Sequence, residues 1–205
     1  MSCANSSVDT LSALLREQKA AFNAQGAVTA VARRARIQRV IDMLVAHHEA
    51  LAEAMDADFG GRPQGFSLMN DVLGSLGSLK HARDHLEGWM QDEPRPVFSP
   101  YDQLGAEAWV MYQPKGTVGI LGTWNAPLYT LLSPLASALA AGNRAILKLQ
   151  RWCHALLRWW RSCLPRRSIR SKWLWSPVAP TWPRPSPHSR STTWCLPAVP
   201  RWPGL

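Results

Sequence analysis

The chain has 205 residues, enough for one ordinary domain or for a domain with a tail, and its formal net charge is +9. The positive charge belongs to one end of the chain. Residues 151–205 carry nine Arg, one Lys and no acidic residue, with eight of the eleven Trp, whereas residues 1–150 carry 13 basic against 14 acidic residues. Because the two parts have unrelated compositions, the average charge is no ground for a nucleic-acid or membrane-surface partner of the whole chain.

The sequence also lacks the signals of a membrane or secreted protein. No apolar run reaches the roughly 18–20 residues that a membrane span requires, and residues 1–9 lack the basic and apolar regions of a secretory signal. We therefore expect a cytoplasmic protein with no membrane partner. The four cysteines show neither a paired C-x-x-C spacing nor a disulfide framework. Cys153 and Cys163 with His154 could form a metal site, but unpaired thiols are the simpler interpretation, so we expect no metal.

Three stretches of the first hundred residues have the apolar spacing of amphipathic helices, and they are Ser7–Asn23, Thr29–Phe59 and Ser67–Met90. In the second stretch, four arginines between positions 33 and 39 lie opposite the apolar stripe, where we expect a solvated face. In the third, Gly74 and Gly77 are expected to let another element approach closely, at some cost in helix propensity. This half of the chain is therefore predicted to be helical.

The following residues predict the beginning of a parallel sheet. Glu107–Gln113 alternates as an exposed strand or hairpin arm does. Thr117–Leu121 and Arg144–Leu149 are short apolar runs, typical of strands buried on both faces. Between them, Pro127–Ala141 is a helix of small residues that ends at Gly142–Asn143. Strand, helix and strand form a βαβ unit, so the expected fold class is α/β, with N-terminal helices followed by the start of a doubly wound, Rossmann-like parallel sheet.

The periodicity is lost beyond Gln150, where Trp, Arg, Pro and Ser mix without a repeat of 2 or 3.6. We therefore expect residues 151–205 to be irregular or disordered. The expected organisation has three parts: a helical N-terminal segment over residues 1–106, the start of an α/β domain over residues 107–150, and a Trp-, Arg- and Pro-rich tail over residues 151–205.

Two motifs lie on the predicted βαβ unit. Residues 114–128 read P-K-G-T-V-G-I-L-G-T-W-N-A-P-L, and residues 139–148 read L-A-A-G-N-R-A-I-L-K. Both motifs, and the spacing between them, resemble the aldehyde dehydrogenase superfamily, whose cofactor domain opens with P-x-G-V-x-G-x-I-x-P-W-N-x-P-L and continues to A-A-G-N-x-x-x-x-K-P. The helical half upstream is most similar to the coniferyl-aldehyde dehydrogenase branch. The resemblance covers about residues 10–149 and then stops.

The resemblance implies an NAD(P)-binding α/β domain and an enzyme that oxidises a small aldehyde, here an aromatic one, to its acid with NAD or NADP as cofactor. It implies that the side-chain amide of Asn125 stabilises the oxyanion, a role worth roughly 3–4 kcal/mol per donor. It implies that Lys148 hydrogen-bonds the adenosine ribose. The cofactor cleft would be lined by Leu121, Gly122, Thr123 and Trp124. Family members form homo-oligomers, which this chain need not do.

The same resemblance, with the strand order, places the two main residues. Asn125 and Lys148 are expected at the carboxyl ends of adjacent parallel strands, where open α/β sheets bind ligands. Without the surrounding motif, Asn125 would be interpreted as a turn residue and Lys148 as a solvated lysine at a strand end. The glycines at positions 116, 119 and 122 do not form a G-x-G-x-x-G fingerprint, in agreement with this family.

Three departures from the family pattern bear on activity. Thr123 replaces the proline before Trp-Asn, so we expect a less rigid loop. The family's K-P-S-E becomes Lys148-Leu149-Gln150-Arg151, which removes a glutamate that contacts the ribose. In family members the catalytic cysteine, the general-base glutamate of E-L-G-G and the F-T-G-S segment follow residue 150, and the sequence holds none of them in that context. We therefore expect a truncated and inactive fragment.

Other interpretations compete with this one. The Arg- and Trp-rich tail could bind nucleic acid, because Arg neutralises phosphates and aromatic rings stack on bases. It has no recognisable motif and few Lys and Gly, so we do not expect a nucleic-acid partner. The chain could also be a structural fragment that pairs with another subunit through its helical half. His81 with His85, and His47 with His48, could each contribute to a metal site, but no third ligand accompanies either pair.

A frameshift accounts for the composition of the tail. If one base was lost near the codons for residues 149–151, each original codon consisted of the third base of one present codon and the first two bases of the next. Trp codons then conceal Leu, Met or Val, and Pro codons conceal Ser, Pro, Thr or Ala. Residues 194–200 permit Leu-Val-Phe-Thr-Gly-Ser-Thr, which resembles the family's next cofactor motif, and residues 165–178 permit another family-like segment. The alternative is a natural disordered tail, a class usually poor in aromatic residues.

Overall fold

The computed structural model describes residues 8–150, 152–163 and 173–175. The helices are α1 (Val8–Gln25), α2 (Ala30–Ala46), α3 (His48–Phe59), α4 (Gln64–Ser67), the π-helix η1 (Leu68–Leu73), α5 (Gly74–Trp89), the 3-10 helix η2 (Asp102–Leu104), α6 (Tyr129–Ala140) and α7 (His154–Cys163). The strands are β1 (Glu93–Arg95), β2 (Ala108–Val110), β3 (Thr117–Leu121), β4 (Arg144–Lys148) and β5 (Trp173–Trp175).

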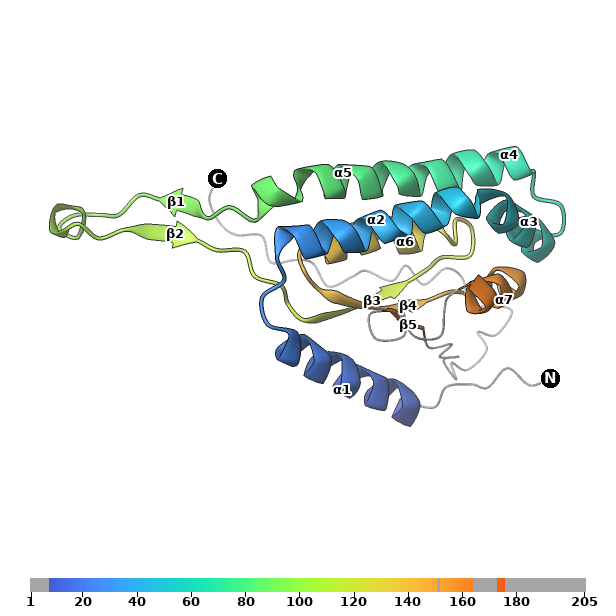
Figure 1. Ribbon diagram of the computed structural model, residues 1–205, viewed down its shortest axis with the longest axis horizontal. Coiled ribbons are helices and arrows are strands. Elements are labelled where there is room, and N and C mark those ends of the chain that lie inside the picture. Colours follow the sequence, from blue (N-terminus) through green and yellow to red (C-terminus); the bar gives the residue numbers. More distant parts are fainter. Residues whose placement is uncertain (1–7, 151, 164–172, 176–205) are drawn as a thin grey trace, which may run out of the picture.

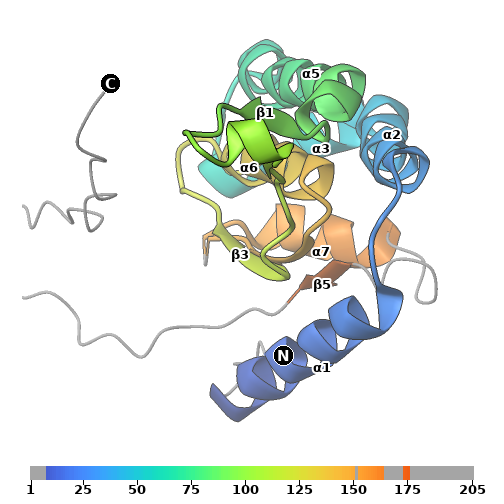
Figure 2. The same cartoon turned by 90° about the vertical axis from the view of Figure 1, so that its left-hand side faces the viewer.

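Helices and sheet are stacked in layers (Figures 1 and 2). Helices α2 and α5 pack against each other and cover α6, which lies on β3 and β4, while α1 lies across the sheet from them and contacts β3. Strand β4 pairs in parallel with β3 on one side and with β5 on the other. The β3–α6–β4 unit confirms the predicted βαβ unit and the α/β fold class with helices before the sheet.

The centre of the molecule is the apolar helix α6. Its leucines Leu131, Leu132 and Leu135 are buried, because α2 and α5 cover one side of the helix and the sheet covers the other. Burying one such side chain contributes about 1.5–3 kcal/mol relative to leaving it exposed. The buried side chains of α2, α3, α5, β4 and α7 join the same cluster. The position of the sheet edge beside α6 is therefore set by one continuous core.

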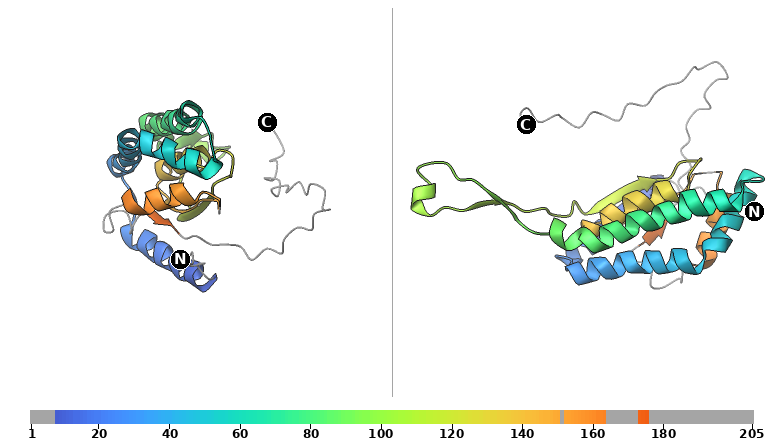
Figure 3. Two further views of the ribbon diagram at one scale, coloured as in Figure 1. Left: turned by 90° about the vertical axis from the view of Figure 1, so that its right-hand side faces the viewer. Right: turned by 90° about the horizontal axis from the view of Figure 1, so that it is seen from above.

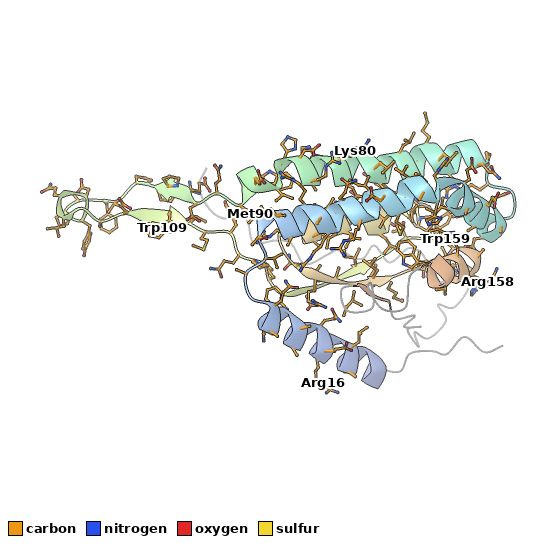
Figure 4. The ribbon with its side chains drawn as sticks, in the orientation of Figure 1. Arg16, Lys80, Met90, Trp109, Arg158 and Trp159 are labelled. Atoms are coloured by element: carbon orange, nitrogen blue, oxygen red, sulfur yellow. The ribbon has the colours of Figure 1, made fainter. Side chains whose placement is uncertain are left out.

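The hairpin β1–β2 projects away from this core as an arm (Figures 1 and 3). Its strands pair antiparallel, with Glu93 opposite Val110, so the predicted hairpin arm over Glu107–Gln113 is confirmed, with the regular strand limited to Ala108–Val110. Figure 4 shows Trp109 on the arm, with Met90 close to its foot. Six large apolar or aromatic side chains of the arm are exposed, namely Phe98, Tyr101, Leu104, Trp109, Met111 and Tyr112.

Two of the predicted helices are interrupted. The stretch Thr29–Phe59 forms two helices that meet at His47, although the hydrogen bonds continue through this point: His47 N donates to Met43 O, and His47 O accepts from Leu51 N. Because the ladder is unbroken and no Gly or Pro is present, the sequence carries no stop signal there. The stretch Ser67–Met90 is helical throughout, but its first part is the π-helix η1.

The expectation of a solvated arginine face on α2 is wrong for two of the four arginines. Arg33 and Arg36 are buried. Arg33 donates from Nε and Nη1 to the carbonyl oxygens of Val28 and Ala140, both at 3.0 Å, and Arg36 donates to Oε1 of Gln25 at 2.8 Å. Buried guanidinium groups need such acceptors, since an unpaired buried charge is costly. Burial lowers the pKa of Arg33 and of Arg36 from the ordinary value.

The expectation that residues 151–205 are irregular is wrong for α7 and β5. In α7, Leu156 and Trp160 lie four residues apart and are buried with Cys153 in one stripe that packs towards α3. The two carboxylate oxygens of Asp58 accept hydrogen bonds from backbone N–H groups in the first turn of α7, from Ala155 at 2.6 Å and from Leu156 at 2.9 Å. These bonds stabilise the start of α7. The rest of the tail lies outside the described residues.

A third correction concerns β3, which was expected to be buried on both faces. Only Ile120 is buried, while Gly119 and Leu121 are exposed, because in the described part of the chain β3 is an edge strand whose fully covered face is the one towards α6. Strand β4 is buried along Arg144–Leu147 as expected.

Glycines 142 and 77 give a matched test of the packing. Gly142 has φ +84°, and an added Cβ would lie 2.8 Å from Cζ of Arg33, which cannot move because its nitrogens are bonded. We expect Gly142→Ala to lower the free energy of unfolding by about 2–4 kcal/mol. At Gly77 an added Cβ would have no neighbour within 4 Å, so the prediction of a close approach is wrong there. The prediction is confirmed at Gly74, where an added Cβ would lie 3.0 Å from Cδ2 of Tyr129.

The control is Gly77→Ala, which lies inside α5 and is expected to stabilise the chain by up to about 1 kcal/mol through helix propensity. Urea denaturation followed by circular dichroism measures both variants. Equal midpoints for the two alanine variants would contradict the packing of Arg33 against Gly142.

Candidate functional site

The candidate site lies where β3 and β4 end. Leu121 and Lys148 are partners in the parallel register, and the backbone N–H of Gly122 donates to the carbonyl oxygen of Lys148 at 2.8 Å. Asn125 follows in the loop between β3 and α6, so the structure confirms that Asn125 and Lys148 lie at the carboxyl ends of adjacent parallel strands. The roles predicted for Asn125, Lys148 and residues 121–124 in oxyanion and cofactor binding stay predictions.

The loop between β3 and α6 lies close to the helix that follows. An added Cβ at Gly122 would lie 2.9 Å from Cγ of Leu131, which is fully buried, so this position admits no larger residue without a shift. On either side of Gly122, the side chains of Leu121 and Trp124 are 70% and 64% exposed. The sheet edge thus presents an indole and an aliphatic side chain to solvent beside the half-buried Lys148.

Asn125 is exposed, and its side chain is oriented by a neighbour. Its Oδ1 accepts a hydrogen bond from Oγ1 of Thr123 at 2.8 Å. The amide nitrogen Nδ2 has no hydrogen-bond partner in the part of the chain that the structure describes. An exposed amide nitrogen can donate to a ligand oxygen, as the predicted oxyanion role requires.

Two buried residues that the sequence did not indicate support this loop. Asp71, which lies on η1 and is fully buried, accepts the backbone N–H groups of Leu128 and Tyr129 at 3.1 Å, at the start of α6. Arg62 pairs with the other oxygen of Asp71 at 2.5 Å. In the sequence, Arg62 lies in a turn-like G-G-R-P stretch over residues 60–63, and neither motif contains Arg62 or Asp71.

A hollow of about 430 Å³ lies beside the loop and is lined by Trp124, Asp58, Phe59, Trp152 and Cys153. The thiol of Cys153 is buried. Burial raises its pKa from the ordinary 9.0 to about 11, with smaller contributions from the carboxylates of Asp58 and Asp71. The thiolate is the nucleophilic form, so Cys153 is a poor nucleophile at neutral pH.

This pKa predicts the reactivity of Cys153. We expect iodoacetamide to alkylate Cys153 of the folded chain slowly at pH 7 and faster as the pH approaches 11, since this thiol is roughly a hundredfold less ionised than one with a pKa of 9. Because the folded-state pKa is the higher one, the stabilisation by the neutral thiol is complete below pH 9 and is lost as the pH rises to about 11. Mass spectrometry of the Cys153 peptide measures the rate.

The control is the same peptide in the chain unfolded by guanidinium, where the thiol has its ordinary pKa. Equal rates in the folded and unfolded chains at pH 7 would show that the thiol is not shielded. Replacing Cys153 by alanine should remove the contribution of this thiol to the loss of stability between pH 9 and 11.

The described residues offer neither a metal cluster nor a membrane span. No group of three or more His, Cys, Asp or Glu side chains there is placed to hold a metal ion. The rings of His81 and His85 lie 4.2 Å apart on α5, and Nδ1 of His85 bonds to the carbonyl oxygen of His81. None of the described helices is both long and apolar enough to span a bilayer. Most of the tail considered for nucleic acid lies outside the described residues.

Open α/β sheets bind ligands outside the carboxyl ends of their parallel strands, and here an amide and a lysine lie at that edge. A family model described as the aldehyde dehydrogenase family matches residues 1–156. The chain belongs to the aldehyde dehydrogenase family. The match ends within the first residues of α7.

Two bacterial relatives resemble about two thirds of the chain. A probable coniferyl aldehyde dehydrogenase of Caulobacter vibrioides is 43% identical over 136 residues, which are 66% of this chain and 28% of that protein. The coniferyl aldehyde dehydrogenase of a Pseudomonas species is 41% identical over 140 residues, covering 68% of this chain and 28% of that protein. The chain thus spans little more than a quarter of these relatives.

Solved structures show the same fold. The substrate-bound state of AldH from Staphylococcus aureus superimposes with a TM-score of 0.72 at 21% identity, covering 82% of this chain and 36% of that one. The NADP+ complex of succinic semialdehyde dehydrogenase from Streptococcus pyogenes has a TM-score of 0.67 at 18% identity, covering 79% of this chain and 34% of that one. At these identities the likeness concerns the fold alone.

Proposed function

We propose that this chain carries part of an aldehyde-oxidising site, in which the side-chain amide of Asn125 donates a hydrogen bond to the oxyanion formed from the aldehyde. The observation that carries the proposal is the state of this side chain: Oδ1 is held by Thr123, and the exposed Nδ2 is left to donate. An oxyanion is stabilised most by a donor that is oriented in advance, since no reorganisation is then needed during the reaction.

The cofactor side of the site is proposed around Lys148. Lys148 is half-buried at the end of β4, and its ammonium group suits the hydroxyls of the ribose of NAD or NADP. Leu121, Gly122, Thr123 and Trp124 would line the same side. The donor set fits one half of a dinucleotide, because it offers a cation for hydroxyl groups and an exposed indole face for a ring. When bound, the nicotinamide supplies the hydride acceptor, while the chain binds and orients.

The substrate is proposed to be an aromatic aldehyde. Support comes from the names of the two relatives, which are coniferyl aldehyde dehydrogenases, and from their identity of 41–43% to about two thirds of this chain.

We infer that the chain as it stands does not turn over aldehydes, because it has no thiol in the family's catalytic context and Cys153 is too weakly ionised to replace one. A frameshift after Lys148 is the proposed cause. The family match that ends at residue 156 supports this, as do the family-like segments concealed in residues 165–178 and 194–200.

Further proposals concern assembly and location. The exposed apolar side chains of the β1–β2 arm support pairing with a second copy, as family members do by resemblance. A cytoplasmic location and the division of the chain at residues 106 and 150 stay predictions. Nucleic-acid binding by the tail is not proposed, since no described residue favours it.

Titration with NAD and NADP tests the proposed cofactor side. We expect weak binding, on the order of millimolar, seen as a saturable shift of the backbone amide signals of Leu121–Trp124 and Lys148. Replacing Lys148 by methionine should weaken binding about tenfold, because a charged hydrogen bond is lost. The control is Lys115→Met, which removes an exposed lysine at the opposite end of β3 and should have no effect. The absence of a saturable shift with either nucleotide would overturn the proposal.

A further inference from the structure

Asn125 is held at its backbone by a buried arginine outside both motifs. Nη1 of Arg62 donates to the carbonyl oxygen of Asn125 at 2.8 Å, across 63 positions of sequence. Arg62 is only 8% exposed, and its guanidinium carbon lies 4.7 and 4.8 Å from the ring centres of Phe59 and Phe66. A guanidinium held between two rings loses the freedom to swing, so its bond to the loop has a fixed direction.

The other end of Arg62 is anchored by Asp71. This carboxylate is fully buried and uses both oxygens: Oδ2 accepts from Nη2 of Arg62, and Oδ1 accepts the first backbone N–H groups of α6, from Leu128 and Tyr129. The loop that carries Asn125 is therefore tied to η1 at its helix end and through Arg62 at its middle. Charged hydrogen bonds in a water-excluded site are the strong ones.

The side chain of Asn125 is held separately by Thr123. Oγ1 of Thr123 donates to Oδ1 of Asn125 at 2.8 Å, and the backbone N–H of Thr123 donates to Oγ1 of Thr130 at 2.9 Å. A proline at position 123 has neither a hydroxyl nor an N–H group and could make neither bond. The threonine that departs from the family pattern therefore adds two contacts that orient the loop.

We propose that Arg62, anchored by Asp71, and Thr123 are the positioning residues of the Asn125 amide. Arg62 fixes the backbone of Asn125, and Thr123 fixes its side-chain carbonyl, so that Nδ2 is the group presented to a substrate oxygen. The inference rests on the proposed oxyanion role of Asn125 for its functional meaning. The geometry it describes is measurable without substrate or nucleotide.

The experiment reads the side-chain amide signal of Asn125 by nuclear magnetic resonance in the full chain, with the signal assigned by its loss in Asn125→Asp. Arg62→Lys and Thr123→Val should each shift this signal towards the position of a freely rotating amide. Arg62→Lys should also speed hydrogen exchange at Leu128 and Tyr129 about tenfold, because the ion pair that holds Asp71 is weakened. Thr123→Val should leave exchange at those two amides unchanged.

The matched control is Leu79→Ala, which removes a fully buried side chain of α5 and changes none of the hydrogen bonds of the loop. It should lower the melting temperature and leave the Asn125 signal in place. The proposal is overturned if the signal does not move in Arg62→Lys and Thr123→Val, or if Leu79→Ala moves it equally, which would make it a reporter of general stability. The Asn125 signal is measured without nucleotide. A titration that shows no binding at Lys148 therefore bears on the proposed function, whereas an unmoved Asn125 signal bears on the positioning residues.

Discussion

Replacing Asp71 by alanine is expected to lower the free energy of unfolding by about 3–5 kcal/mol, because it leaves a buried guanidinium without its carboxylate. The variant also leaves the first N–H groups of α6 without an acceptor, at Leu128 and Tyr129. Domains of this size have a total stability of about 5–15 kcal/mol, so this single change removes a large part of it. We expect the variant to be partly unfolded at 37 °C.

Urea denaturation followed by circular dichroism measures this effect. The control is Asp84→Ala, since Asp84 forms its ion pair with Arg83 at the surface of α5 and should leave the midpoint unchanged. If Asp71→Ala and Asp84→Ala have the same midpoint, the buried pair does not hold α6 and the loop as described. Asp71→Asn should fall between the wild type and alanine, because its carbonyl oxygen can still accept from the start of α6.

The second large effect concerns activity. The present chain is expected to show no oxidation of an aromatic aldehyde with NAD or NADP. The protein encoded by the gene with one base restored after the Lys148 codon is expected to catalyse this oxidation. The physical reason is the missing nucleophile: without an ionisable thiol in place, no covalent intermediate forms from which hydride can leave. Production of NADH or NADPH, followed by absorbance, measures the difference.

In the restored enzyme, Asn125→Ala should lower kcat by about a hundred- to a thousandfold, as expected when one oxyanion donor is removed. The control is Lys115→Met, which lies at the other end of β3 and should leave kcat unchanged. Turnover by the present chain that disappears in Cys153→Ala or Cys163→Ala would contradict the account, since it would place the nucleophile in the tail.

The sequence allowed the sheet edge to be predicted because its information is local. A short apolar run, a helix of small residues and a second apolar run specify a parallel βαβ unit, and parallel strands end on the same edge. Asn125 and Lys148 are therefore placed by strand ends alone. Their proposed chemical roles come from the motifs around them, which the fold does not supply.

The remaining contacts were hidden because their partners are distant in sequence. The bond from Arg62 to Asn125 and the bonds from Asp71 to α6 span more than fifty positions, and a π-helix carries Asp71 without a recognisable sequence signal. The buried Arg33 binds the carbonyl oxygen of Ala140, and any residue offers such an oxygen. No pattern of residue types in the sequence predicts the contacts of Arg62, Asp71 or Arg33.

The helix α7 escaped prediction for a different reason. Its buried stripe consists of Leu156 and Trp160 and continues the buried Cys153 that precedes the helix, while Arg158 is exposed and Trp159 is half-buried. Since tryptophan is amphipathic, its presence on several sides of the helix concealed the period of the apolar face. The cap that starts this helix is Asp58, almost a hundred positions upstream.

The most direct test of the interrupted aldehyde dehydrogenase is the nucleotide sequence of its gene. Restoring one base after the Lys148 codon should open a frame that encodes F-T-G-S near the codons for residues 194–200, followed by E-L-G-G and a cysteine motif. Such a frame would supply the cofactor contacts, the general base and the nucleophile in the part of the chain that follows β4. If no open frame with these motifs appears, the tail is not a frameshift product and the account of this chain as an interrupted enzyme is wrong.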